Sequence, residues 1–161
     1  MRHQYASARQ FFEAARAAAR EAERISIELR AMRAREQALG GGGYGARIRS
    51  TPEPDRMAGK VAARIDREAM LEERQEEDYR LIDAACEILY GADNRSGLYA
   101  LVGWPADAIY HHYLALATWE ETAALVGYSE RRTYECVAQA LDLADANGDM
   151  WTRLGMGMAE A

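Results

Sequence analysis

Two adjacent arginines, Arg131 and Arg132, are the residues of this chain whose surroundings most suggest chemistry. They lie in the stretch GYSERRTYECVAQAL, where Gly127 and Ser129 precede a run with helical spacing. Guanidinium groups at the start of a helix can bind phosphate or the edges of DNA bases. Yet residues 118–145 hold only these two basic residues against six acidic ones, a local charge of −4. A unit with this charge needs basic groups from elsewhere in the chain, or from a second subunit, to bind DNA.

The other candidate residues do not form a recognisable catalytic or metal site. His111 and His112 are adjacent, so they cannot share one helix face, and no carboxylate or cysteine lies at ligand spacing from them. The acidic run EERQEEDYR lacks the Glu-x-x-His pair of carboxylate metal sites. The chain also has no GxSxG, HExxH or P-loop motif. We therefore expect no enzyme activity, no metal and no cofactor.

Three glycines, Gly40, Gly42 and Gly45, formally match the dinucleotide motif GxGxxG. That motif needs a strand before the glycines and a helix directly after them. Here a helical pattern precedes the glycines, and Pro52 and Pro54 follow them. We interpret residues 40–55 as the loop of a helical hairpin.

The elements that must position the arginines are all predicted to be helices, which makes the fold all-α. A first helix is predicted from about Tyr5 to Leu39, because this stretch has no proline or glycine and is rich in alanine and arginine. A second is predicted from about Asp55 to Tyr90. Residues 1–90 then form a long antiparallel hairpin. The expected apolar stripes are Phe12, Ala15, Ala19, Ala22, Ile25, Leu29, Met32 and Leu39 on the first helix, and Met57, Val61, Ile65, Ala69, Leu71, Tyr79, Ile82, Cys86 and Leu89 on the second.

The two long helices differ in net charge. Residues 1–49 hold ten basic and five acidic residues, whereas residues 50–90 hold six and eleven. We interpret this as a basic first helix lying against an acidic second one, with solvated ion pairs between them. The alternative is that the basic helix contacts nucleic acid phosphates or an acidic partner.

A second domain, residues 91–147, is predicted to hold a helix-turn-helix, followed by a tail at residues 148–161. One helix begins at Pro105 and ends near Ala117. Thr118 and Glu121 form a capping box for a helix over residues 119–126. Gly127 provides the turn, and Ser129 caps a last helix that ends near Ala144. The expected core face of the last helix is Thr133, Cys136 or Val137, Ala140 and Leu141, and the expected core aromatic residues are Tyr110, Tyr113 and Trp119.

The composition excludes several protein classes. No run of about 18 uncharged apolar residues exists, and the N-terminal residues carry charges throughout where a signal peptide needs an apolar stretch. We expect a protein of the (host) cytoplasm without membrane contact. Cys86 and Cys136 are 50 residues apart without a CxxC pair, so we expect buried thiols and neither a disulfide nor a zinc site.

The stretch YLALATWEETAALVGYSERRTYECVAQAL resembles the fourth region of bacterial sigma factors, and more specifically the small phage and prophage regulators of the RinA and ArpU kind. The shared features are an aromatic-rich helix before the motif, a Trp-Glu-x-Ile-Ala-like segment, a Gly-Tyr-Ser turn, an arginine two residues after the serine, and a closing Ala-Leu. Here they are Tyr113, Trp119-Glu120 with Thr122-Ala123, Gly127-Tyr128-Ser129, Arg131 and Ala140-Leu141. The resemblance loosely covers residues 5–144, and its specific part is about 30 residues long.

The resemblance implies a sequence-specific DNA-binding protein that controls phage transcription, with the last helix in the major groove. We expect Ser129, Arg131, Arg132, Tyr134 and Gln139 to face DNA. Two departures stand out, since such proteins place a basic residue at the position of Glu135 and a histidine at that of Val137. A carboxylate at 135 repels phosphate and can accept only from a cytosine amino group or a protein donor.

Two other functions fit the same pattern. The acidic helix-turn-helix is also suited to a protein partner, such as RNA polymerase, a sigma subunit or a phage assembly component. A DNA-packaging recognition subunit would have the same architecture, with an oligomer larger than that of a regulator. We expect a homo-oligomer in either case, and binding to DNA that depends strongly on salt.

Overall fold

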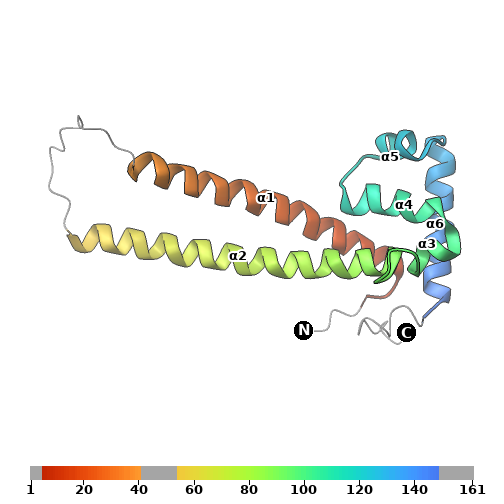
Figure 1. Ribbon diagram of the computed structural model, residues 1–161, viewed down its shortest axis with the longest axis horizontal. Coiled ribbons are helices and arrows are strands. Elements are labelled where there is room, and N and C mark those ends of the chain that lie inside the picture. The colour runs from red at the N-terminus through yellow and green to blue at the C-terminus, as the bar shows by residue number, and fades with distance from the viewer. Residues whose placement is uncertain (1–4, 41–53, 149–161) are drawn as a thin grey trace. The chain divides into compact units, whose positions relative to one another are not determined.

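The computed structural model describes residues 5–40 and 54–148 (Figure 1). The elements of this part of the chain are all helices and it contains no β-strand, so the prediction of an all-α fold is confirmed. The predicted loop over residues 40–55 and the predicted tail lie almost entirely outside the described residues. The elements are α1 (Ala8–Gly40), α2 (Pro54–Tyr90), α3 (Gly97–Val102), α4 (Trp104–Ile109), the π-helix η1 (Tyr110–Leu114), α5 (Trp119–Val126) and α6 (Glu130–Ala146).

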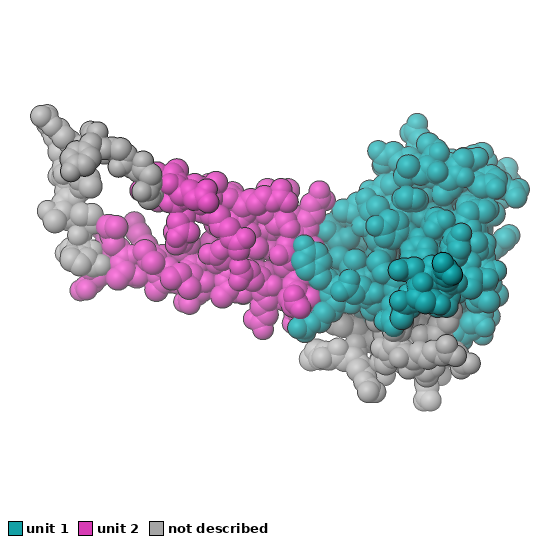
Figure 2. All heavy atoms as spheres, viewed as in Figure 1, with its two compact units in different colours: residues 1–20, 78–161 teal, residues 21–77 magenta. Residues whose placement is uncertain are grey.

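The chain divides into two compact units, shown in different colours in Figure 2. The first, unit 1, comprises residues 1–20 and 78–161, and the second, unit 2, comprises residues 21–77. Unit 1 therefore contains the start of α1 and the end of α2 as well as the C-terminal helices. This division does not follow the predicted boundary at residue 90, because the large apolar residues of the two helix ends pack with the C-terminal helices.

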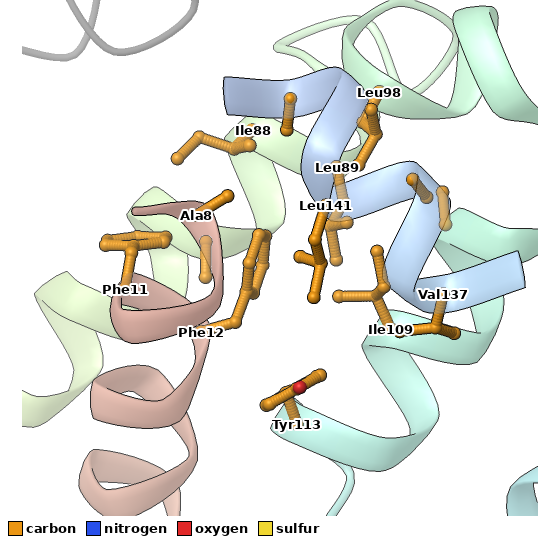
Figure 3. Close-up of a cluster of buried hydrophobic side chains, with 14 of the residues drawn as sticks. Ala8, Phe11, Phe12, Ile88, Leu89, Leu98, Ile109, Tyr113, Val137 and Leu141 are labelled. Atoms are coloured by element: carbon orange, nitrogen blue, oxygen red, sulfur yellow. The ribbon is translucent and has the colours of Figure 1, made fainter. Parts of the chain in front are cut away.

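The core of unit 1 is built around two phenylalanines at the start of α1. Phe11 and Phe12 are fully buried, and their rings meet edge to face with centroids 5.2 Å apart. Phe12 also contacts the Tyr113 ring, at a centroid distance of 5.9 Å. Figure 3 shows that the surrounding side chains converge from α2, α3, α4 and α6. The burial of each such ring contributes about 1.5–3 kcal/mol. The buried neighbours include Ile88, Leu89, Leu98, Ile109, Val137 and Leu141.

A carboxylate near the end of α6 fixes the start of α1. The backbone N–H of Ala8 donates to Asp145 Oδ1 at 2.6 Å. The first N–H groups of a helix have no partner within the helix, and a negative charge there is favourable. Asp145 thus joins the two ends of unit 1 that are farthest apart in the sequence.

In unit 2, α1 and α2 run antiparallel around a small apolar cluster. Ile25 and Leu29 of α1 pack with Leu71 of α2. Beside this cluster, Gln75 Nε2 donates to Ser26 Oγ at 2.7 Å and to the Ala22 carbonyl at 3.1 Å. Exposed ion pairs flank it, each stabilising by a few tenths of a kcal/mol. They join Arg33 to Glu68 and Glu72, Arg64 to Glu36, Arg67 to Glu28, and Arg74 to Glu21.

These ion pairs do not follow the net charges of the two helices. Three of the arginines, Arg64, Arg67 and Arg74, come from the acidic helix α2, and their partners are glutamates of the basic helix α1. Within unit 2 the pairing depends on which residues lie beside the contact between α1 and α2. The opposite net charges of the two long segments therefore do not explain their contacts.

The predicted stripe of α2 was wrong over the first half of the helix. Met57, Val61 and Ile65 are 53%, 46% and 55% exposed, Ala69 is exposed as well, and in the second half Tyr79 is 45% exposed. The seam residues are instead Arg64, Glu68, Leu71 and Gln75, whose spacing of three and four residues is that of a heptad. The polar ends of three of these residues bond to α1: Arg64 to Glu36, Glu68 to Arg33, and Gln75 to Ser26 and the Ala22 carbonyl. The stripe of α1 was correct from Phe12 to Leu29, but Leu39 is 82% exposed.

Candidate nucleic-acid interface

The N-terminus of α5 has the capping box that the sequence predicted. Thr118 Oγ1 accepts from the backbone N–H of Glu121 at 3.2 Å, and Glu121 Oε2 accepts from the N–H of Thr118 at 2.8 Å. These hydrogen bonds hold the pKa of the Glu121 carboxyl below its usual value. The start of α5 is therefore fixed by residues that are adjacent in the sequence.

The turn between α5 and α6 also has the predicted chemistry. Gly127 adopts a left-handed conformation with φ of +79°, which favours glycine. The N–H groups of Gly127 and Tyr128 both donate to the Ala123 carbonyl, at 2.9 and 3.1 Å. Ser129 then caps α6, its hydroxyl accepting from the N–H of Arg132 at 3.3 Å. Three residues of turn thus set the direction of α6.

The buried face of α6 determines which side chains are available to a partner. Thr133, Val137, Ala140, Leu141 and Ala144 are buried, which confirms the predicted core face with Val137 as its central residue. Cys136 is half-buried, as is Cys86, so the expectation of two buried thiols was wrong. The opposite face of α6 is exposed and carries Arg131, Arg132, Glu135 and Gln139.

Glu135 lies at the middle of this exposed face, one turn after Arg131. Arg131 Nε donates to Glu135 Oε1 at 2.8 Å, and the two side chains are 89% and 55% exposed. This pairing raises the pKa of Arg131. One of the two predicted DNA-contacting arginines is therefore already paired with a carboxylate of its own helix.

Arg132 belongs to a group of stacked residues that the sequence did not predict. Its guanidinium carbon lies 5.5 Å from the centroid of the Tyr128 ring, a cation–π distance. Tyr128 in turn stacks on Trp104 of α4, with centroids 4.3 Å apart and planes 21° from parallel. The spacing of four residues between Tyr128 and Arg132 was visible in the sequence, but the contact of Trp104 depends on the fold. This contact directs the Arg132 side chain toward Tyr128, in the turn before α6.

Tyr134, the third predicted contact residue, adjoins a second aromatic group. Its ring is 48% exposed and meets Trp119 edge to face at 5.2 Å. Trp119 stacks on His112 at 3.7 Å, and His112 Nδ1 is bonded to the Ala117 carbonyl at 3.0 Å. Burial, with the nearby charge of Arg16, lowers the pKa of His112 to about 4, so the ring is neutral at pH 7.

The segment before α5 differs from the predicted helix. The α-helix ends at Ile109 and continues as a π-helix over Tyr110–Leu114, and Leu116 has a left-handed φ of +63°. A π-turn holds an extra residue, and here Tyr113 turns into the core while His112 faces Trp119. Tyr113 was correctly predicted as a core residue. Trp119 is only half-buried, and Tyr110 is exposed.

Much of the acidic charge of residues 118–145 is engaged with donors of the same chain. Glu121 is bonded within the capping box, Glu135 pairs with Arg131, and Asp145 accepts from Ala8. Each of these contacts places positive charge or the positive end of a helix next to the carboxylate. The remaining acidic residues of the segment are Glu120, Glu130 and Asp142. Glu121 and Asp145 are thus bonded to donors within the fold, whereas the count of −4 already includes the pairing of Glu135 with Arg131.

Arg131, Arg132 and Tyr134 are exposed on the first two turns of α6, directly after its cap Ser129, and Gln139 is exposed further along the helix; Arg132 and Tyr134 contact different aromatic groups. In the described part of the chain, no three His, Cys, Asp or Glu side chains are grouped so that they could hold a metal ion. No helix among the described residues has the length and apolar character to span a membrane. Comparison with protein-family models, with curated proteins and with solved structures finds no match, so the resemblance to the phage regulators stays a prediction.

Proposed function

We propose that the chain is a DNA-binding transcriptional regulator in which α5 and α6 act as a helix-turn-helix and α6 enters the major groove. The observation that carries the proposal is the exposure of the first two turns of α6, with two arginines and a tyrosine on them. The other face of α6 is occupied by the core. Only the face that holds Arg131 and Arg132 is available to a duplex.

Each exposed residue has a distinct part in this proposal. Ser129 and the helix N-terminus bind a phosphate, since backbone N–H groups and the helix dipole favour an anion there. Arg131 and Arg132 contact phosphates or a guanine edge, and Gln139 can bond an adenine through two hydrogen bonds. The expected affinity is modest, because Glu135 competes with DNA for Arg131.

Fluorescence anisotropy with fragments of the cognate genome at low salt tests the proposal. The double variant Arg131→Ala with Arg132→Ala loses two phosphate contacts, which weakens binding by roughly 60-fold at about 0.1 M salt. Arg95→Ala is the matched control, because Arg95 is exposed but lies in the turn before α3. Absence of binding, or equal affinities of the double variant and the control, would exclude DNA reading by α6.

A second candidate function, binding of a protein partner through the same surface, is favoured by two residues. Glu135 places a carboxylate at the middle of the exposed face of α6, and Leu125 of α5 is 62% exposed. A basic partner, such as a segment of RNA polymerase, would use both residues. The two functions differ in their response to Glu135→Gln, since this change strengthens DNA binding and weakens the binding of a basic protein.

A further inference from the structure

A row of charged residues follows one side of α1 within unit 1. Arg9, Glu13, Arg16 and Arg20 are spaced by four, three and four residues, which places them on one helix face. The row holds three arginines and one glutamate. From Arg9 to Arg20 it extends about 16 Å along the helix.

Two arginines of this row have no acidic partner. Within residues 5–40 and 54–148, Arg16 and Arg20 form no ion pair with a carboxylate. Arg24, four residues further along the same helix, is bonded to both Glu21 and Glu28. Arg16 and Arg20 instead repel each other, and this repulsion adds to burial in lowering the pKa of Arg16. Within the described residues neither cation is paired with a carboxylate, and such an arrangement is one that an anion stabilises.

Contacts within unit 1 connect these arginines to the start of α5. Arg16 Nη1 donates to the Ala117 carbonyl at 3.4 Å, one residue before the cap of α5. The same carbonyl is bonded to His112, which stacks on Trp119. Trp119 contacts Tyr134 on the exposed side of α6. Arg16 therefore lies beside the start of the helix that precedes α6, where helix-turn-helix proteins cross the DNA backbone, and Arg20 follows one turn further along α1.

We infer that Arg16 and Arg20 form a phosphate-binding site for the DNA backbone, next to the N-terminus of α5. The inference rests on the proposed function and extends it to residues about 100 positions away in the sequence. The phosphodiester is the ligand because two guanidinium groups present a pair of donors without reading a base edge. These arginines supply the positive charge that the acidic residues 118–145 lack.

The test measures affinity against salt concentration for two duplexes, one from the cognate genome and one of random sequence. The double variant Arg16→Gln with Arg20→Gln is expected to reduce the slope of log affinity against log salt by about 1.8, and the affinity by roughly 60-fold at about 0.1 M salt. Both duplexes are affected equally, because phosphates are independent of sequence. Arg24→Gln, which removes an arginine already paired with carboxylates, leaves the slope unchanged.

Arg16→Lys and the single variant Arg20→Gln separate charge from folding. Lysine keeps the charge at position 16, so the slope stays near that of the wild type, and Arg20 is exposed, so its loss does not disturb the core. An unchanged slope in the double variant, with binding still dependent on Arg131 and Arg132, would overturn this inference and leave the proposed function standing. Absence of binding to either duplex by the wild-type chain would overturn both.

Discussion

Replacement of Glu135 by glutamine is the most direct test of how α6 meets its partner. Glutamine keeps the length and shape of the side chain but removes the charge that holds Arg131 at 2.8 Å. The pair spans one turn and both side chains are exposed, so its loss costs only a few tenths of a kcal/mol of folding stability. Any large change in binding therefore reports on the surface and not on folding.

The size of the effect follows from one released arginine. Glu135 competes with DNA for Arg131 in the wild type, so its removal strengthens this contact: the slope of log affinity against log salt becomes steeper by up to about 0.9, and the affinity rises by up to roughly eightfold at about 0.1 M salt. Loss of the like-charge repulsion between Glu135 and the duplex acts in the same direction. Tighter binding with a steeper slope is thus the expected result.

Anisotropy titrations from about 50 to about 200 mM salt measure both quantities. Asp142→Asn is the control, since Asp142 lies two turns further along the same face of α6. This substitution removes an equal charge without releasing an arginine. Its slope should match that of the wild type. Weaker binding by Glu135→Gln would refute the reasoning, because it would mean that the carboxylate itself makes a contact, with a cytosine amino group or a protein donor.

Three further predictions concern the scaffold of this surface. Gly127→Ala should lower the free energy of unfolding by about 1–2 kcal/mol, because the φ of Gly127 is +79°, although a new Cβ would meet no neighbour within 4 Å. The control Gly59→Ala, inside α2, should raise the free energy of unfolding by up to about 1 kcal/mol. Urea titrations measure both values, and equal changes would contradict the assignment of the turn. Thr118→Ala should lower the thermal midpoint by removing the capping box, at a cost of about 1 kcal/mol, whereas an unchanged midpoint would mean that the cap does not stabilise the unit. His112 has a pKa lowered from 6.5 to about 4, so the folded chain binds this proton less readily than the unfolded chain, and stability should fall as the pH falls from about 6.5 to about 4. The nominal loss of about 3 kcal/mol is reduced to about 1–2 kcal/mol by solvent screening of the half-buried ring. In urea titrations across this pH range, His112→Phe should show no such loss of stability. A pH profile equal to that of the wild type would contradict the assignment of this pH dependence to His112.

The parts of the fold that the sequence predicted correctly depend on short-range chemistry. Thr118 and Glu121 cap each other across three residues, and Gly127 and Ser129 act on their immediate neighbours. The residue type alone restricts each of these positions, whatever the rest of the chain does. The bounds of α5 therefore agree with the prediction at both ends.

The error on α2 has a different origin. Apolar residues occur on more than one side of this helix, so their spacing does not identify the side that faces α1. Met57, Val61 and Ile65 form a regular row but are exposed, while Arg64 and Glu68 lie at the seam. The choice between these faces is made by the partner helix, where Glu36, Arg33 and Ser26 bond to polar side chains of α2. A rule based on hydrophobicity alone has no access to that partner.

The aromatic groups around α6 were likewise beyond the reach of sequence reasoning. Trp104, His112 and Trp119 come from three different elements; Trp104 stacks on Tyr128, and Trp119 stacks on His112, which lies in the π-helix before α5. A regular helix over the same residues would place His112 and Tyr113 differently. Hence the candidate residues on α6 could be named from the sequence, but not the side chains that fix them.

The acidic balance of residues 118–145 bears on DNA binding only through the positions of the charges. Asp145 is directed to the start of α1, and Glu121 is bonded within its own cap, so neither is free to repel a phosphate in the way that an unpaired surface carboxylate would. The same fold brings Arg16, which lies outside the segment, within hydrogen-bonding distance of Ala117. A charge count over a stretch of sequence includes carboxylates that folding bonds to backbone donors and omits cations that folding adds. Glu135 is the exception, since it remains on the exposed face, and its effect on binding therefore decides between a surface for DNA and a surface for protein.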